Sequence, residues 1–85
     1  MRITLRYFAS VREAVGMGQE SFALTQEAST VGAVREALAA RGGVWHAALG
    51  PERSVRMAYN QVMCGPETAV ADGAEVAFFP PVTGG

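Results

Sequence analysis

The chain begins with a strict alternation of apolar and polar side chains. In an extended segment, Ile3, Leu5 and Tyr7 face one way and the polar residues between them face the other. A period of two predicts a strand with one buried face. Phe22 and Leu24 repeat the pattern after a short glycine-containing turn. Because few residues separate the two segments, we expect them to pair as antiparallel neighbours.

Two helices are predicted from capping residues and from an apolar stripe. Ser10 and Glu13 have the spacing of a capping box, so a short helix is expected to start with Ser10 as its N-cap and to end near Gly16. Thr30 is a good N-cap residue for a longer helix, which we expect to end at the glycines at positions 42–43. The buried stripe of this main helix is predicted to contain Val31, Val34 and Leu38.

The second half of the chain predicts two further strands. Residues 54–62 carry apolar side chains at alternate positions and indicate a third strand, and residues 75–79 indicate the last one. A short helical turn is expected at residues 45–49. The order strand, strand, helix, strand, strand favours an α+β domain, with one mixed sheet packed on one main helix. We expect this domain to span residues 1–79 and to be followed by a flexible, extended tail, residues 80–85.

Composition excludes several classes of function. The 85 residues are enough for one domain, and 49% hydrophobic with 18% charged residues is typical of a globular protein. A net charge of −1 argues against a nucleic-acid binder. No apolar run approaches the roughly 20 residues that span a bilayer, and the first residues do not resemble a signal peptide. We therefore expect a cytoplasmic protein that binds neither nucleic acid nor membranes.

The sequence offers few groups for catalysis or metal binding. Cys64 is either a reactive thiol or a small apolar residue, and the absence of a nearby histidine favours the second interpretation. His46 is the only histidine and is expected at the surface. Because no Cys/His cluster is present, the sequence predicts no metal site.

The C-terminal segment carries the strongest functional signal. Phe78 and Phe79 end the last predicted strand, two prolines follow at 80–81, and the chain finishes in Val82-Thr83-Gly84-Gly85. The prolines restrict the backbone, whereas a terminal diglycine can enter a channel in which any Cβ would clash. A carboxylate is a poor electrophile until it is activated, and a terminal glycine leaves the activated carbon unhindered. We therefore expect chemistry at the last two residues.

Residues 72–85, DGAEVAFFPPVTGG, resemble the end of the MoaD-type sulfur carriers, the family of molybdopterin synthase small subunits. Residues 8–13, FASVRE, and 59–61, YNQ, extend the resemblance over almost the whole chain. The family usually has an acidic residue where Ala74 stands, and we expect this position to lie in a turn. The resemblance implies a ubiquitin-like β-grasp fold, in which the first and last strands lie side by side in parallel at the centre of the sheet.

The resemblance also implies a reaction and a set of partners. A ubiquitin-activating-like adenylyltransferase would use ATP to adenylylate Gly85, and a sulfur donor such as a cysteine desulfurase or a rhodanese-like protein would help to convert it into a thiocarboxylate. Gly84 and Gly85 would then enter the large subunit of a heterotetrameric synthase, where sulfur passes to cyclic pyranopterin monophosphate. The chain would be the non-catalytic subunit of this sulfurtransferase and would bind no cofactor tightly. The tail residues implied to contact partners are Pro80, Pro81, Val82 and Thr83.

A second candidate site follows from the alternation. If Tyr7 faces the main helix, Phe8 faces away from it, and Phe79 faces the same way in the last strand. With the implied parallel pairing, the two rings would meet on the open face of the sheet, where Met63 would join them. An exposed apolar cluster marks a partner surface. The alternative is a bulge that returns these rings to the core. The family's apolar partner contacts match Phe8, Met63 and Phe79.

Three other functions stay open. The chain could carry sulfur for another pathway, such as thiazole synthesis, or it could be a ubiquitin-like modifier that forms isopeptide bonds through Gly85. It could also be a structural module with an inert tail. The apolar, proline-containing segment before the diglycine favours the molybdopterin family. Arg6 and Arg12 are the cations that we expect closest to a partner.

Overall fold

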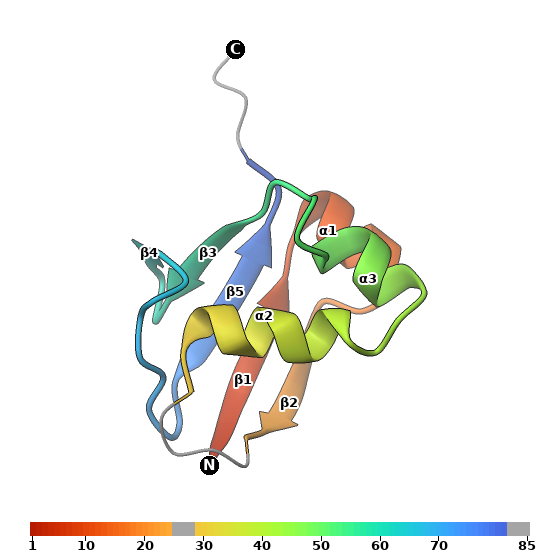
Figure 1. The fold of residues 1–85 in the computed structure, drawn as a ribbon. Helices are drawn as coiled ribbons and strands as arrows, with labels where there is room; N and C mark the ends of the chain where they lie inside the picture. The colour runs from red at the N-terminus through yellow and green to blue at the C-terminus, as the bar shows by residue number, and fades with distance from the viewer. Residues whose placement is uncertain (25–28, 82–85) are drawn as a thin grey trace.

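The computed structural model describes residues 1–24 and 29–81. Strands and helices alternate only in the first part of the chain; two helices then follow one another, and three successive strands end the described residues. The chain leaves the last strand at the end of the molecule opposite the N-terminus (Figure 1). The elements are β1 (Arg2–Tyr7), α1 (Ala9–Val15), β2 (Gln19–Ala23), α2 (Val31–Ala39), α3 (Val44–Leu49), β3 (Arg56–Tyr59), β4 (Val62–Cys64) and β5 (Glu75–Phe79).

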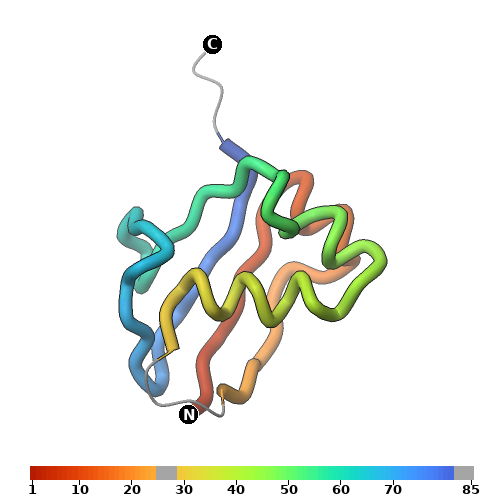
Figure 2. Tube along the Cα trace, viewed as in Figure 1, coloured from red at the N-terminus to blue at the C-terminus, as the bar shows by residue number. Residues whose placement is uncertain are grey.

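The strands form one mixed sheet in the order β2-β1-β5-β3-β4. β1 and β5 pair in parallel, and the beginning and end of the described chain run side by side through the middle of the sheet (Figure 2). The other neighbouring strands are antiparallel, including the predicted pairing of β1 with β2. A mixed sheet with its first and last strands parallel at the centre is the β-grasp fold, as expected.

Helix α2 crosses one face of the sheet and closes the core against it (Figure 1). Thr30 caps the helix as predicted, because its side chain accepts a hydrogen bond from the backbone N–H of Ala33 at 3.1 Å. Each large apolar side chain buried in this contact contributes roughly 1.5–3 kcal/mol to folding. The fully buried side chains of the contact are Ile3, Leu5, Tyr7, Val31, Val34, Leu38, Val76 and Phe78.

The capping box predicted at the start of α1 is wrong. Ser10 lies inside the helix, and Phe8 occupies the N-cap position without a side-chain cap. The backbone N–H of Phe8 still donates to the carbonyl of Phe78 at 3.2 Å, so the sheet pairing extends to Phe8 and the helix must begin immediately after it. Ala9 makes this abrupt turn with a φ of 51°, in the left-handed region. The predicted end at Gly16 is confirmed, with a φ of 80°.

The third strand was also predicted incorrectly. Residues 54–62 do not form one strand, because Asn60 and Gln61 adopt positive φ values of 49° and 69° and reverse the chain between β3 and β4. Two successive left-handed residues are typical of a tight type I′ hairpin. Asn60 ties the turn to β5, since its backbone N–H donates to Glu75 O at 2.8 Å and its Oδ1 accepts from Glu75 N at 2.9 Å.

Within the described residues, no helix has the length and apolar character that crossing a membrane requires.

Candidate functional site

An aromatic pair lies on the open face of the sheet, opposite α2, where β1 and β5 end. Phe8 directly follows β1 and is 41% exposed, and Phe79 is the half-buried last residue of β5. The two ring centroids are 6.3 Å apart at an interplanar angle of 84°, a favourable edge-to-face arrangement. The predicted meeting of these rings on the open face is therefore confirmed, and the bulge that would return them to the core is not formed.

A groove of about 480 Å³ lies beside the aromatic pair. Ala58 and Ala77 face each other across β3 and β5 and line this groove. Because their side chains end at Cβ, they leave a hollow between the larger side chains of Phe8, Phe79 and Pro80. We call this hollow the Phe8–Phe79 groove. It can receive an apolar side chain from another molecule.

Met63 shares the open face but does not line the Phe8–Phe79 groove. It lies on β4 opposite Ala58 and is 52% exposed. The apolar surface therefore continues from the groove across β3 to the edge of the sheet. Met63 lines a separate cavity of about 400 Å³ together with Val55, Arg56, Met57, Cys64 and Pro66.

The root of the tail belongs to the groove. Pro80 is half-buried, Pro81 is exposed, and both line the Phe8–Phe79 groove. The same two prolines line a cavity of about 580 Å³ on the side of α1 and α3. The chain therefore leaves the body directly beside the aromatic pair. The predicted tail residues Val82, Thr83, Gly84 and Gly85 lie outside the described residues.

The two cations predicted near a partner have different surroundings. The guanidinium carbon of Arg6 is 5.4 Å from the ring centroid of Phe8, and its Nη1 is 3.9 Å from Oε1 of Glu75. Arg6 therefore lies at the border of the groove. Arg12 lines a different cavity, beside Gly18.

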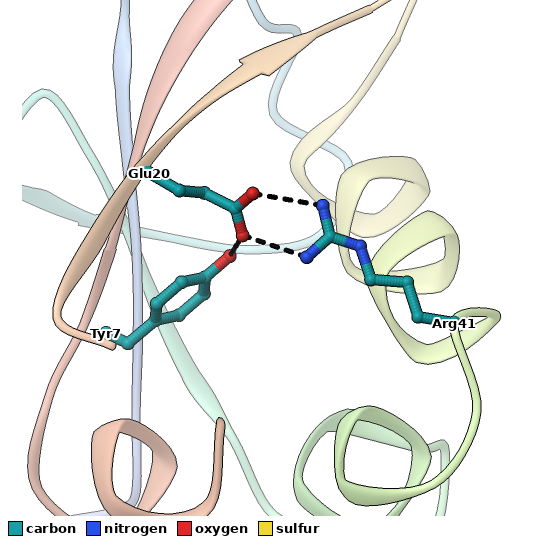
Figure 3. Close-up of polar contacts among 3 residues, drawn as sticks. All are labelled: Tyr7, Glu20 and Arg41. Atoms are coloured by element: carbon teal, nitrogen blue, oxygen red, sulfur yellow. Dashed lines mark hydrogen bonds and ion pairs between the residues drawn. The ribbon is translucent and has the colours of Figure 1, made fainter. Parts of the chain in front are cut away.

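A polar cluster that sequence reasoning missed lies on the opposite face of the sheet. Tyr7 donates its hydroxyl hydrogen to Oε1 of Glu20 at 2.7 Å, and Arg41 donates to both carboxylate oxygens at 2.9 and 3.1 Å (Figure 3). The Arg41 guanidinium also stacks 4.3 Å from the ring centroid of Trp45. We call Tyr7, Glu20 and Arg41 the Tyr7 cluster. The sequence did offer a clue to this cluster, because Tyr7 was predicted to face the core and a buried tyrosine hydroxyl requires a hydrogen-bond partner.

The pKa values of the Tyr7 cluster follow from these contacts. Burial raises the pKa of Tyr7 far above its ordinary range, and its hydrogen bond to the Glu20 carboxylate raises it further. Burial on its own would raise the pKa of Glu20, but hydrogen bonds from Arg41 and Tyr7 lower it below its ordinary value. The hydrogen bond to Glu20 raises the pKa of Arg41. The cluster thus holds one fixed protonation state at neutral pH, which suits a structural role.

Cys64 and His46 lie apart from the groove. Cys64 is half-buried and packs against the core, as expected for a small apolar residue, and His46 lies on the exposed side of α3. Across residues 1–24 and 29–81, no group of three or more His, Cys, Asp and Glu side chains is arranged to hold a metal ion.

The sequence is similar to known sulfur carriers over almost its full length. The model of the ThiS family matches residues 5–85. The molybdopterin synthase sulfur carrier subunit of Haemophilus influenzae is 41% identical over 83 residues, which cover 98% of this chain and 99% of that protein. The subunit of the same name from Escherichia coli is 40% identical with the same coverage.

Solved structures agree with this similarity. SAMP1 from Haloferax volcanii has a TM-score of 0.78 at 26% identity and covers all of both chains. The putative molybdopterin converting factor subunit 1 from Pyrococcus furiosus has a TM-score of 0.79 at 25% identity, over 96% of this chain and 99% of that one. A chain of the Helicobacter pylori complex of molybdopterin-converting factor subunits 1 and 2 shares the fold, with a TM-score of 0.69 at 20% identity over the full length of both chains. The chain therefore belongs to the ThiS family and groups there with the molybdopterin synthase sulfur carrier subunits.

Proposed function

We propose that the protein is the sulfur carrier subunit of a molybdopterin synthase and acts in molybdenum cofactor biosynthesis. The observation that carries the proposal is the combination of a terminal Gly84-Gly85 with a β-grasp body whose aromatic groove lies at the root of the tail. Identity of about 40% to sulfur carrier subunits over nearly the whole chain supports it. In this proposal, residues 1–79 form the docking body and residues 80–85 form the reacting tail.

The proposed chemistry starts at the carboxylate of Gly85. This carboxylate attacks the α-phosphate of ATP on an adenylyltransferase and displaces pyrophosphate, which leaves an acyl-adenylate. The outer sulfur of a persulfide on a donor protein then displaces AMP and leaves an acyl disulfide. A second thiol attacks the donor sulfur of this S–S bond, which forms a disulfide on the donor and releases Gly85 as a thiocarboxylate. Because glycine has no side chain, the carbonyl carbon is open to attack throughout. The protein itself supplies the reacting group and binds no cofactor tightly, since ATP is used by the activating enzyme.

The Phe8–Phe79 groove is the proposed docking surface for the large subunit and for the activating enzyme. Phe8 and Phe79 are the anchors, and Met63 extends the apolar contact across the sheet. From Pro80 to Gly85 an extended chain spans at most about 20 Å, which is enough to enter an active site on a partner while the body stays docked. Pro80, Pro81, Val82 and Thr83 would line the entrance, and the prolines reduce the entropy lost when the tail is ordered.

The last step of the proposal takes place on the large subunit. The thiocarboxylate sulfur of Gly85 attacks a side-chain carbon of cyclic pyranopterin monophosphate and displaces an oxygen substituent from it, which leaves a thioester between carrier and substrate. Water then cleaves the acyl–sulfur bond, so the sulfur stays on the pterin and the carrier returns as a carboxylate. Each dithiolene needs two sulfur atoms, so carriers must be exchanged or reloaded between the two transfers. The acid–base groups and the pterin site belong to the large subunit in this scheme.

A ubiquitin-like modifier is the second candidate, because SAMP1 of Haloferax volcanii, small archaeal modifier protein 1, has the same fold at 26% identity. A modifier would pass the activated Gly85 to lysine amines instead of to sulfur. Conjugates of increasing mass on blots with an antibody against the protein would support this candidate.

The proposed function is tested by intact mass measurement after incubation with ATP, an activating enzyme and a sulfur donor. The expected result is a gain equal to the replacement of one oxygen by sulfur, located at Gly85. The loaded protein mixed with the large subunit should then convert cyclic pyranopterin monophosphate into molybdopterin. An unchanged mass with a loading system that is active on another carrier would refute the proposal.

A further inference from the structure

The arginines of the described structure differ in how their side chains are used. Arg2, Arg35 and Arg41 donate side-chain hydrogen bonds within the chain. Arg6 does not do so among the described residues, because the nearest carboxylate oxygen, Oε1 of Glu75, lies 3.9 Å away and is beyond hydrogen-bond distance. Its Nε is shielded from solvent and has no acceptor in residues 1–24 or 29–81. Apart from this long ion pair with Glu75, the Arg6 guanidinium therefore has no polar partner among the described residues.

Arg6 is nevertheless held in place beside the Phe8–Phe79 groove. Its guanidinium lies 5.4 Å from the centre of the Phe8 ring, a cation–π distance. In the register of β1 and β5 it stands directly opposite Ala77, which lines the groove. A guanidinium that is already positioned by packing loses less conformational freedom on binding than a free one.

The groove and its neighbouring charges favour one kind of partner surface. The groove is lined mainly by apolar side chains, and Glu75 is its only acidic lining residue in the described part of the chain. Arg6 at the border would complete a site for a segment that presents an apolar side chain and an acidic one. Arg pairs with carboxylates through two parallel hydrogen bonds, and arginines beside aromatic anchors are frequent hot spots of interfaces.

We propose that the partner covering the Phe8–Phe79 groove places a carboxylate against Arg6. This inference rests on the proposed function, because the covering partner is taken to be the large synthase subunit that receives the tail. Pro80 lines the groove, so a subunit that accepts the tail also covers the border where Arg6 lies. The carboxylate would take hydrogen bonds from the guanidinium that no group of the described chain accepts.

Glu75 provides the competing interpretation and a way to test it. Its carboxylate lies near Arg6 and would repel an incoming carboxylate. If the partner instead presents a cation, that cation would pair with Glu75. Glu75→Gln should therefore strengthen binding by a few-fold if the inference holds, and it should weaken binding if the partner group is a cation.

The experiment is a titration of the full-length chain with the large synthase subunit of the same organism, with the dissociation constant measured at low and high salt. The variants are Arg6→Gln, Arg6→Lys, Arg6→Glu and Glu75→Gln. Arg2→Glu is the matched control, because Arg2 lies on the same strand and face as Arg6 but four residues away, about 13 Å along β1. Thermal melting of every variant shows that it is folded.

We expect Arg6→Gln to weaken binding by about 30-fold or more and to reduce its salt dependence, since truncating one member of a desolvated charge pair is costly. Arg6→Glu should be weaker still. Arg6→Lys should lie between the wild type and Arg6→Gln, because it keeps the charge but lacks the planar fork. Arg2→Glu should change the dissociation constant by less than about three-fold.

The outcomes separate this inference from the proposed function. If the wild-type chain does not bind the large subunit, the proposed function and this inference fail together. If the wild type binds but Arg6→Gln behaves like the Arg2→Glu control, the inference is refuted and the proposed function stands. A tightening by Arg6→Gln, or a weakening by Glu75→Gln, would also refute it.

Discussion

Tyr7 and Phe8 are consecutive aromatic residues whose environments are opposite. Tyr7 lies on the helix-covered face of the sheet, where its ring contacts Trp45 of α3, and it is 1% exposed. Its hydroxyl donates to Glu20, which also accepts hydrogen bonds from Arg41. Phe8 points to the open face, and Arg6 lies over its ring without a hydrogen bond to any described residue. On one side of the strand the polar group is thus hydrogen-bonded within the chain, whereas on the other side an aromatic ring is exposed and the neighbouring guanidinium lacks a hydrogen bond to any described residue.

This difference indicates that the two faces of the sheet have different roles, one in stability and the other in partner binding. Groups on the helix face bind one another, so changes there should cost free energy of unfolding. On the open face, the exposed Phe8 and the guanidinium of Arg6 lie at the border of a groove that no described residue fills, so changes there should cost partner binding. A carrier that exchanges between partners needs such a division, because each docking event must leave the fold intact.

Removal of Gly85 should give the largest effect and the sharpest separation. We expect sulfur loading to be abolished, because the activated carboxylate would be misplaced, while the melting temperature stays unchanged. Intact mass after the loading reaction and calorimetry measure the two quantities. Extension of the chain by one alanine is the matched control and should also abolish loading. A truncated protein that unfolds would contradict the division.

Phe78 and Phe79 test the comparison at neighbouring positions of β5. Phe78 is fully buried, so Phe78→Ala should lower the free energy of unfolding by about 3–5 kcal/mol. Phe79→Asp should instead weaken binding to the large subunit by about 30-fold or more, since it places a charge at a desolvated anchor. Denaturant unfolding and titration measure the two effects. Equal destabilisation by both variants would show that Phe79 belongs to the core.

Tyr7→Phe should have a smaller effect, confined to stability. The change removes the hydroxyl that donates to Glu20 at 2.7 Å, and a hydrogen bond to a charged group contributes about 1.5–3 kcal/mol. Tyr59→Phe is the control, because the Tyr59 hydroxyl accepts from the backbone of Ala71 at an exposed position and should contribute less. The denaturant midpoint should fall while affinity for the large subunit stays the same. A loss of affinity equal to that of Phe79→Asp would break the comparison.

The pH dependence of stability should show the smallest effect. Because the pKa of Glu20 is lowered in the folded state, its contribution is present above its ordinary value of 4.5 and is lost as the pH falls through the folded-state pKa. Glu20→Gln should therefore be less stable than the wild type at neutral pH, with the difference shrinking below pH 4.5. Denaturant unfolding over this pH range measures the difference in free energy of unfolding. A difference that does not change with pH would show that ionisation of Glu20 does not contribute to stability.

Local patterns predicted much of the architecture. The alternation of β1 placed Ile3 and Leu5 in the core, and Thr30 marked the start of α2 correctly. The errors arose where distant contacts act on the local chain. Ser10 and Glu13 have the spacing of a capping box, but pairing of Phe8 with Phe78 moved the start of α1. Likewise, Asn60 is tied to Glu75, and this contact accompanies the turn that divides the predicted third strand.

The sequence by itself determined which side chains of β1 and β5 share a face, because a strand has a period of two. The chemistry proposed for Gly84 and Gly85 also comes from the sequence, because residues without side chains leave their carbonyl carbons unhindered. Only the tertiary structure decided that Phe8 meets Phe79, that Ala58 and Ala77 form the floor of a groove between them, and that Tyr7 finds its partner in Glu20. These contacts depend on strand order and register, which join residues far apart in the chain and leave no local signal.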